Sequence, residues 1–273
     1  MFLKRTLVAL VLLPIGLLVI VLGGEIYAGL ICLILGLAAY EFSNLFRIDG
    51  LRPSTILAIA GTVFLVVGRY INGFDSAPWI ISLLILASMT FHLVDYERGR
   101  EKAGTDFAIT MTCIFYIGWI GAYLVSLRNL PEGLWWVLTV LPAVWLADTG
   151  AYLVGSRFGK HKITPRLSPK KSWEGYLGGI LFAVPVTALL TLLWGVWAGP
   201  TSAITPLRGA LLGLILGAFT ILGDLGESMI KRQVGMKDSG KLLPGHGGAF
   251  DRVDSWLWGA VIGYYVITFG FLG

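Results

Sequence analysis

Long apolar runs separated by short polar segments dominate the hydrophobic pattern of this chain. The runs are about 17 residues or longer and lack the alternation of a half-buried strand, so they predict helices that can cross a bilayer. We place these runs at residues 6–22, 26–45, 54–71, 78–94, 107–127, 134–155, 175–197, 208–230 and 255–272. The pattern therefore predicts an all-α, polytopic integral membrane bundle of about nine transmembrane helices.

Composition agrees with a membrane protein and excludes an ordinary soluble domain. The chain is 56% hydrophobic and only 14% charged, whereas soluble domains have about 25% charged residues. The first run follows a basic start and resembles a signal peptide, but it is long and no small-residue cleavage site follows, so we interpret it as a retained span. Cys32 and Cys113 both lie in apolar runs, which excludes a disulfide framework.

The distribution of Lys and Arg predicts the orientation of the bundle. Alternate connections carry 18 of the 21 basic residues, and the intervening ones carry only Arg69, Arg128 and Arg208. Because cytoplasmic loops are enriched in Lys and Arg, this split predicts a cytoplasmic N-terminus. It also explains most of the basic excess, so we expect no nucleic-acid partner.

The last two basic loops hold more Lys and Arg than membrane orientation requires. This excess suggests that the C-terminal half of the chain carries the function. We expect residues 1–140 to form about five scaffold spans. Residues 141–273 are expected to form the catalytic membrane region, with cytoplasmic loops at 156–174 and 231–253.

Several carboxylates fall where hydrocarbon makes them costly. Asp148 lies deep in the sixth run, and Asp224 and Glu227 lie near the end of the eighth. An ionised carboxylate there costs several kcal/mol, about 2.5–3.5 kcal/mol on the insertion scale, and usually marks function. For Glu41, nearer to a span end, an ordinary packing or hydrogen-bonding role is the better interpretation.

The spacing of these acids suggests a metal site. Asp224, Glu227, Ser228 and Lys231 share one helix face, and Asp251 and Asp254 are three residues apart where the last run begins. Several Asp residues without Cys ligands form a hard oxygen site that suits Mg²⁺. We therefore predict one or two Mg²⁺ ions, or Mg²⁺ with a second cation. The predicted ligands are Asp148, Asp224, Asp251 and Asp254.

Basic residues beside a magnesium site indicate phosphoryl or nucleotidyl transfer, which needs charge neutralisation and positioning. The glycines of the segment PGHGG let backbone N–H groups approach phosphate oxygens. A chain embedded mostly in the bilayer implies a lipid substrate. The residues alone thus predict a Mg²⁺-dependent phosphotransfer enzyme that acts on a lipid at the cytoplasmic face.

Two long motifs carry a family resemblance. Residues 228–255, SMIKRQVGMKDSGKLLPGHGGAFDRVDS, resemble the signature of the phosphatidate cytidylyltransferases, also called CDP-diacylglycerol synthases. Residues 147–175, ADTGAYLVGSRFGKHKITPRLSPKKSWEG, are similar to a second block of that family. The specific similarity covers roughly residues 145–258, and Ala249 is a small departure from the pattern.

The resemblance implies a reaction, its substrates and an assembly. CTP and phosphatidate would give CDP-diacylglycerol and pyrophosphate in a reaction that requires Mg²⁺. The reaction would belong to phospholipid biosynthesis at the inner (plasma) membrane, and the enzyme would be a homodimer. Catalytic roles would fall on Asp224, Lys231, Arg232, Lys237, Asp251 and Asp254. Substrate contacts would come from Lys170, Lys171, Ser168, Ser172, Lys231, Arg232, Lys237, His246, Gly247, Gly248 and Arg252.

Two other classes of function remain open from the sequence. A transporter or channel would also have many spans and buried acids, although transporters usually place such acids near the midplane. Another lipid-linked transferase, such as a CTP-using polyprenol kinase or a CDP-alcohol phosphotransferase, would also act on a lipid. The D-G-x-x-A-R motif of the latter is absent from the chain.

Overall fold

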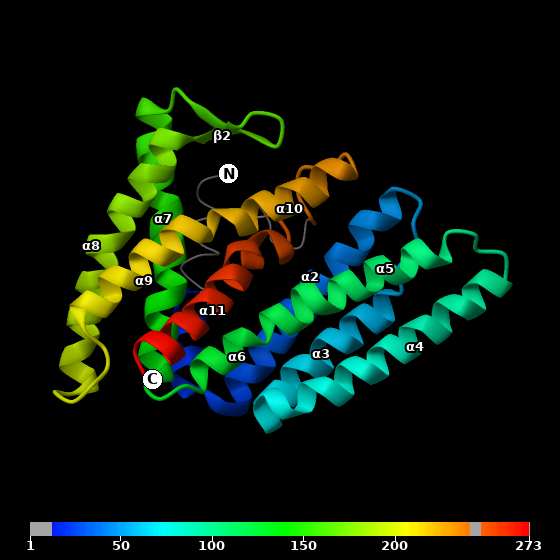
Figure 1. The fold of residues 1–273 in the computed structure, drawn as a ribbon, viewed down its shortest axis with the longest axis horizontal. Helices are drawn as coiled ribbons and strands as arrows, with labels where there is room; N and C mark the ends of the chain where they lie inside the picture. Colours follow the sequence, from blue (N-terminus) through cyan, green and yellow to red (C-terminus); the bar gives the residue numbers. More distant parts are fainter. Residues whose placement is uncertain (1–12, 241–246, 273) are drawn as a thin grey trace. The chain divides into compact units, whose positions relative to one another are not determined.

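The computed structural model describes residues 13–240 and 247–272 and is almost entirely helical (Figure 1). A short apolar helix covers Leu13–Leu22. The labelled helices are α2 (Gly24–Ile48), α3 (Thr55–Asn72), α4 (Ala77–Glu97), α5 (Ala103–Cys113), α6 (Tyr123–Arg128), α7 (Gly133–Phe158), α8 (Trp173–Ala198), α9 (Pro206–Phe219), α10 (Ile221–Gln233) and α11 (Phe250–Gly270). The 3₁₀ turn η1 (Gly73–Ser76) joins α3 to α4, and the π-helical turn η2 (Ile114–Trp119) follows α5. The predicted all-α membrane fold is confirmed.

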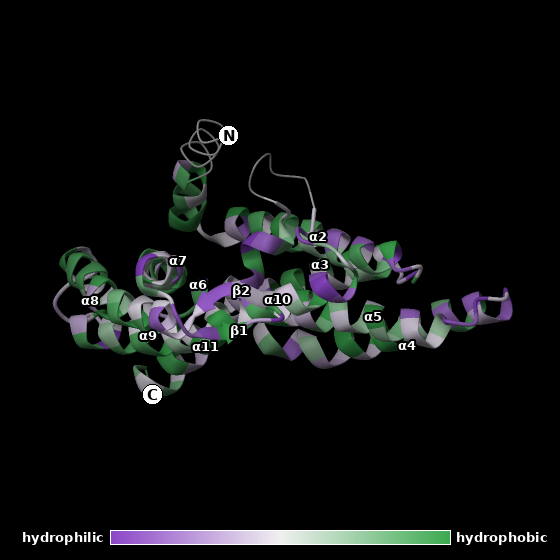
Figure 2. Cartoon of the chain, turned by 90° about the horizontal axis from the view of Figure 1, so that it is seen from above, coloured by the Kyte–Doolittle hydropathy of each residue, from purple (hydrophilic) through white to green (hydrophobic). Residues whose placement is uncertain are grey.

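Within the described ranges, six helical stretches are long and apolar enough to cross a membrane. One of them, Thr55–Glu97, is interrupted by η1 and therefore contains both α3 and α4. Figure 2 shows hydrophobic residues along most of the helices and hydrophilic ones at the β1–β2 hairpin. The chain is thus a multi-pass membrane protein, while the count of nine spans stays a prediction.

A two-stranded sheet occupies part of the loop predicted at 156–174. Strands β1 (Lys162–Thr164) and β2 (Ser168–Ser172) pair antiparallel, with Lys162 opposite Ser172. The hairpin leads directly into α8, and its last residue, Ser172, is the N-cap of that helix. The Ser172 hydroxyl accepts a hydrogen bond from the N–H of Gly175. Such a cap satisfies one of the free N–H groups of the first turn.

Contacts group the chain into two compact units. Unit 1 contains Met1–Ser126 and Lys231–Val253, and unit 2 contains Leu127–Ile230 and Asp254–Gly273. Both α10 and α11 are therefore shared between units, since each boundary falls inside a helix. The division predicted near residue 140 concerns scaffold and catalysis, and this grouping by contacts does not test it.

In unit 1, α3, α4, α5 and η2 enclose an apolar cluster that includes Leu65, Leu84 and Ile114. In unit 2, α7, α8 and α9 lie side by side and pack through small residues (Figure 1). A Cβ atom on Gly179 of α8 would lie 2.5 Å from the carbonyl oxygen of Ala147 on α7. Glycine therefore permits a close approach of backbones, as is common among membrane helices.

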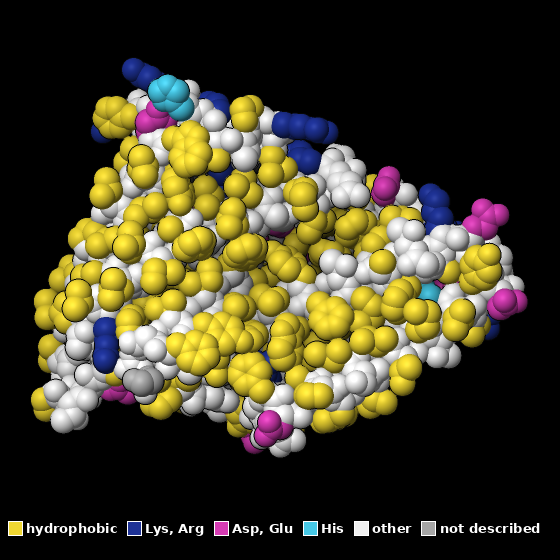
Figure 3. Space-filling model, viewed as in Figure 1, with side chains coloured by type: hydrophobic (Ala, Val, Ile, Leu, Met, Phe, Trp, Pro, Cys, Tyr) yellow, Lys and Arg dark blue, Asp and Glu magenta, His cyan; other side chains and the backbone are white. Residues whose placement is uncertain are grey.

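Large hydrophobic side chains remain on the outside of both units. Figure 3 shows them over much of the viewed face, with few charged side chains among them. In α8, Leu181 and Val196 are 74% and 79% exposed. An apolar surface of this extent is unstable in water and suits contact with lipid.

Arg69, near the end of the predicted run 54–71 and counted above with the connection that follows, is buried in the structure. It lies in the last turn of α3 and is only 2% exposed. Its guanidinium lies over the rings of Phe74, Trp119 and Tyr123 at 3.6, 4.5 and 4.9 Å, and it donates a hydrogen bond to Ser126 Oγ at 2.9 Å. Cation–π contacts and one hydrogen bond therefore compensate the buried charge.

We expect Arg69→Met to destabilise the protein by about 2 kcal/mol, because the cation–π contacts are lost and Ser126 loses its donor. Thermal denaturation in detergent measures the change. Arg98→Met is the control, since Arg98 is exposed. A variant at position 69 that denatures at the wild-type temperature would contradict this stabilising role.

Candidate functional site

Helix α10 carries two of the acids that the sequence singled out. Asp224 lies in its first turn and Glu227 follows one turn later, so both side chains share one face. Ser228 donates a hydrogen bond to Asp224 Oδ1 at 3.4 Å. Glu227 is 2% exposed, whereas Asp224 is half-buried.

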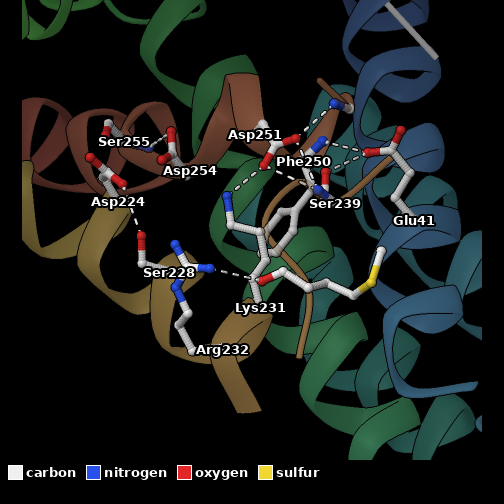
Figure 4. A network of polar contacts seen from close by, with 12 residues as sticks. Glu41, Asp224, Ser228, Lys231, Arg232, Ser239, Phe250, Asp251, Asp254 and Ser255 are labelled. Carbon is white, nitrogen blue, oxygen red and sulfur yellow. Dashed lines mark hydrogen bonds and ion pairs between the residues drawn. The ribbon is translucent and has the colours of Figure 1, made fainter. Parts of the chain in front are cut away.

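Gly223 brings α10 close to the start of α11 within unit 2. A Cβ atom at this position would lie 2.5 Å from the carbonyl oxygen of Asp254 and 2.8 Å from the Trp258 ring. Any larger residue would push the helices apart. Gly223 therefore permits the short distance between the carboxylates of Asp224 and Asp254, which lie next to each other in Figure 4.

Asp224, Glu227 and Asp254 form an acidic cluster. Each offers a carboxylate oxygen, and these oxygens lie within 4.8 Å of one another. Asp148, on α7, is close enough to interact electrostatically with Asp224 and Asp254. The structure thus brings two of the four predicted ligands, Asp224 and Asp254, into one cluster with Glu227, and it places Asp148 nearby.

Lys171 supplies positive charge to this cluster. Its ammonium forms an ion pair with Asp224, and its side chain is 20% exposed. Lys170, the preceding residue of β2, is exposed, because successive residues of a strand point to opposite faces. The hairpin therefore separates two lysines that are equivalent in the sequence.

The remaining predicted contacts of the hairpin have local partners. Ser168 begins β2 and is half-buried, while Ser172 is buried and caps α8. Glu174 accepts hydrogen bonds from the backbone of Lys160 and His161 and pairs with His161 Nδ1 at 2.5 Å. Its carboxylate thus joins the two ends of the hairpin.

Asp251 belongs to unit 1 and has a different environment from the cluster. Its Oδ1 pairs with Lys231 Nζ at 2.6 Å, and its Oδ2 accepts hydrogen bonds from Ser239 N at 3.0 Å and Gly248 N at 2.7 Å (Figure 4). The side chains of Lys231 and Asp251 are 12% and 8% exposed. Asp251 is therefore an anchor for the surrounding backbone and for Lys231.

The glycines of the signature face this network. Gly247 has a φ of 80°, which favours glycine, and a Cβ atom there would lie 2.5 Å from Asp251 Oδ2. Gly248 has no room for a side chain either, and its N–H is donated to Asp251. Its backbone N–H therefore binds a carboxylate of the protein, and the phosphate contact predicted for Gly248 stays a prediction.

Other predicted contact residues lie at the surface or outside the described ranges. Arg232 is exposed and donates to the carbonyl of Met236 at 3.4 Å. Lys237 and Arg252 are also exposed. His246 lies outside the described residues.

Three residues of these networks escaped the predicted site. Glu227 lies on the predicted face of α10. Its spacing of three residues from Asp224 could have added it to the predicted metal ligands. Glu41 and Ser239 were not assigned to the site, although the carboxylate of Glu41 accepts a hydrogen bond from Ser239 Oγ at 3.0 Å. No sequence pattern links these two residues, because 198 positions separate them.

Together, the long apolar helices and the acidic cluster paired with Lys171 characterise a multi-pass membrane protein with carboxylates gathered in one place. The sequence matches the cytidylyltransferase family over residues 3–269, and the chain belongs to that family. It is accordingly an enzyme of the nucleotidyltransferase class.

Relatives cover almost the whole chain. The phosphatidate cytidylyltransferase of Staphylococcus saprophyticus is 34% identical over 259 residues, which cover 93% of this chain and 94% of the relative. The phosphatidate cytidylyltransferase of Synechocystis is 30% identical over 294 residues, covering 91% and 90%. The family resemblance carried by the two motifs is confirmed.

We expect Lys231→Met to destabilise the protein by about 3–5 kcal/mol, because Asp251 loses a buried partner of opposite charge. The double variant Lys231→Met/Asp251→Asn is expected to recover part of this loss, because it also removes the negative charge. Thermal denaturation in detergent measures both, with Lys237→Met as the exposed control. Wild-type stability of the single variant Lys231→Met would show that the ion pair contributes nothing to the stability of the protein.

Proposed function

We propose that this enzyme is a phosphatidate cytidylyltransferase. It transfers CMP from CTP to phosphatidate and yields CDP-diacylglycerol and pyrophosphate. The observation that carries the proposal is the similarity over more than 90% of the chain to relatives of that name. The membrane fold supports a lipid substrate, and the basic residues near the acidic cluster support a substrate rich in phosphate.

In the proposed reaction, an oxygen of the phosphatidate phosphate attacks the α-phosphorus of CTP. A new P–O bond forms as the bond to the β-phosphate oxygen breaks, and pyrophosphate leaves. A phosphomonoester has a second pKa of about 6, so the attacking oxygen is already anionic near neutral pH. The protein therefore needs to position and neutralise phosphates, and it needs no strong general base.

Basic residues would hold these phosphates. Lys171 lies beside the acidic cluster through its ion pair with Asp224, so it can bring positive charge to a phosphate there. Lys231 is oriented by Asp251. The exposed side chains of the same segments can contact the outer phosphates of either substrate, and they are Lys170, Arg232, Lys237 and Arg252.

The acidic cluster fits a magnesium ion by its donor chemistry. Asp224, Glu227 and Asp254 would hold the cation, with Asp148 as a further ligand or a residue that positions one. Three carboxylates so close together repel one another, and hard oxygen ligands are those that Mg²⁺ prefers. When bound, the cation supplies charge neutralisation for the phosphates. We assign Asp251 to orienting Lys231, because both of its oxygens already accept hydrogen bonds.

The cellular setting is part of the proposal. The bias of Lys and Arg supports an active site at the cytoplasmic face of the cell membrane. The family resemblance also implies a homodimer. The molecular mass of the detergent-purified protein would test this oligomeric state.

We expect purified protein in detergent to release pyrophosphate only when CTP, phosphatidate and Mg²⁺ are all present. Omitting each component in turn, with identification of the lipid product by mass spectrometry, tests this. CDP-diacylglycerol as the product supports the proposal. Transfer of the γ-phosphate without pyrophosphate would favour a lipid kinase, and flux without chemistry would favour a transporter.

Asp224→Asn and Asp254→Asn are each expected to weaken cation binding by at least about tenfold, since each removes a charged ligand. Glu227→Gln is expected to act in the same direction. Mn²⁺ titration followed by electron paramagnetic resonance measures the affinity and the number of sites without reference to activity. Glu101→Gln is the control, because Glu101 is exposed on a loop. Unchanged Mn²⁺ affinity in all three cluster variants would remove these residues from the metal site.

A further inference from the structure

Glu41 is a buried carboxylate that no motif of the sequence explains. It lies in the C-terminal third of the apolar helix α2 and is 5% exposed. A charge in such a place needs donors, since an unpaired buried carboxylate is very costly. The donors come from the segment that carries the family signature.

Two hydrogen bonds converge on one oxygen of Glu41. Ser239 Oγ and the backbone N–H of Phe250 each donate to Oε2 at 3.0 Å (Figure 4). Phe250 is fully buried, begins α11, and packs edge-to-face on Phe42 of α2 at 5.6 Å between ring centroids. Glu41 and its neighbour thus hold the start of α11 by a polar and an apolar contact.

The backbone on both sides fits closely around this carboxylate. A Cβ atom on Gly240 would lie 2.3 Å from Glu41 Oε1, and one on Gly248 would lie 2.1 Å from Oε2. The two glycines leave space for the carboxylate and for nothing larger. Glu41 therefore contacts the chain both before and after residues 241–246.

The contacts of Glu41 lead directly to Asp251. Ser239 donates its hydroxyl to Glu41 and its backbone N–H to Asp251, and Gly248 donates its N–H to the same Asp251 oxygen. Asp251 in turn pairs with Lys231. A displacement of Ser239 would therefore change the surroundings of Asp251 and Lys231.

We propose that Glu41 is a positioning residue for the transfer reaction: it holds Ser239 and Phe250, and through them Asp251 and Lys231, in their working arrangement. This inference rests on the proposed function for the reaction that it serves. Its action is indirect, because its carboxylate contacts the signature segment of the protein itself. The geometry gives a role to a residue outside the two motifs.

The hydrogen-bond clamp is tested first, by a measurement that needs no activity. Glu41→Ala is expected to accelerate hydrogen–deuterium exchange at least about tenfold in peptides covering residues 234–240 and 247–256, because the N–H of Phe250 and the hydroxyl of Ser239 lose their acceptor. Peptides of α7 should keep the wild-type rate. Glu25→Gln, at an exposed position in the first turn of the same helix, is the control.

The positioning role is tested by the kinetics of pyrophosphate release. Glu41→Ala is expected to raise KM for CTP or for phosphatidate at least about fivefold, since Lys231 is displaced, and also to lower kcat. A mere loss of folded protein would lower kcat at unchanged KM. Glu41→Gln is expected to restore most activity, because its amide oxygen can accept both hydrogen bonds, whereas Glu41→Asp is one methylene too short.

Ser239→Ala gives a second variant if Glu41→Ala does not fold. It removes one donor to Glu41 and keeps the backbone hydrogen bond to Asp251, so a rise in the same KM is expected. Wild-type exchange rates in the Glu41 and Ser239 variants, or unchanged KM values for both substrates, would overturn the proposal. An inactive wild-type protein would instead contradict the proposed function, and the exchange rates would still decide whether Glu41 holds the segment.

Discussion

Compensation of charge among apolar helices is the constraint on which unit 1 depends. Arg69 lies in an aromatic cage with a hydrogen bond to Ser126, and Asp106 accepts hydrogen bonds from Arg52 N and Arg100 Nε at 2.7 Å each. Asp251 and Glu41 follow the same rule, with donors from the segment before α11. In each case at least one partner is distant in the sequence, so charge compensation joins elements that the apolar pattern leaves independent.

Buried carboxylates have two different roles in this chain, and the hydrogen-bond donors around each carboxylate determine its role. Asp251 is surrounded by N–H groups and an ammonium, so its charge is used to hold protein. In the proposed site, Asp224, Glu227 and Asp254 face one another instead. Carboxylates that repel across a few ångströms form a place where a cation is stabilised. Asp251 thus has a structural role and Asp254 a proposed role in cation binding, although only three residues separate them on α11.

Local and periodic features were predictable from the sequence, and long-range partners were not. The apolar runs predicted the helices, and the cost of Asp224 in hydrocarbon marked it before any fold was known. The β1–β2 hairpin was missed because its strands are short and polar, and without it Lys170 and Lys171 could not be told apart. The aromatic surroundings of Arg69 could not be predicted, because the rings around its guanidinium come from later segments. The hydrogen-bonding role predicted for Glu41 agrees with the structure, but spacing along α2 contains no information about its partners Ser239 and Phe250.

The sequence distance between Glu41 and its donors has a consequence for biogenesis. Ser239 and Phe250 follow it by 198 and 209 positions. A ribosome that makes the chain from its N-terminus therefore delivers α2 to the membrane long before these donors exist. Until then α2 lacks the hydrogen bonds that Ser239 and Phe250 donate to Glu41 and the ring contact between Phe250 and Phe42. Maturation of the first long helix of the protein thus waits for nearly the last residues to be translated, and a nascent chain that stops before Ser239 leaves this acid without the two donors it has in the finished protein.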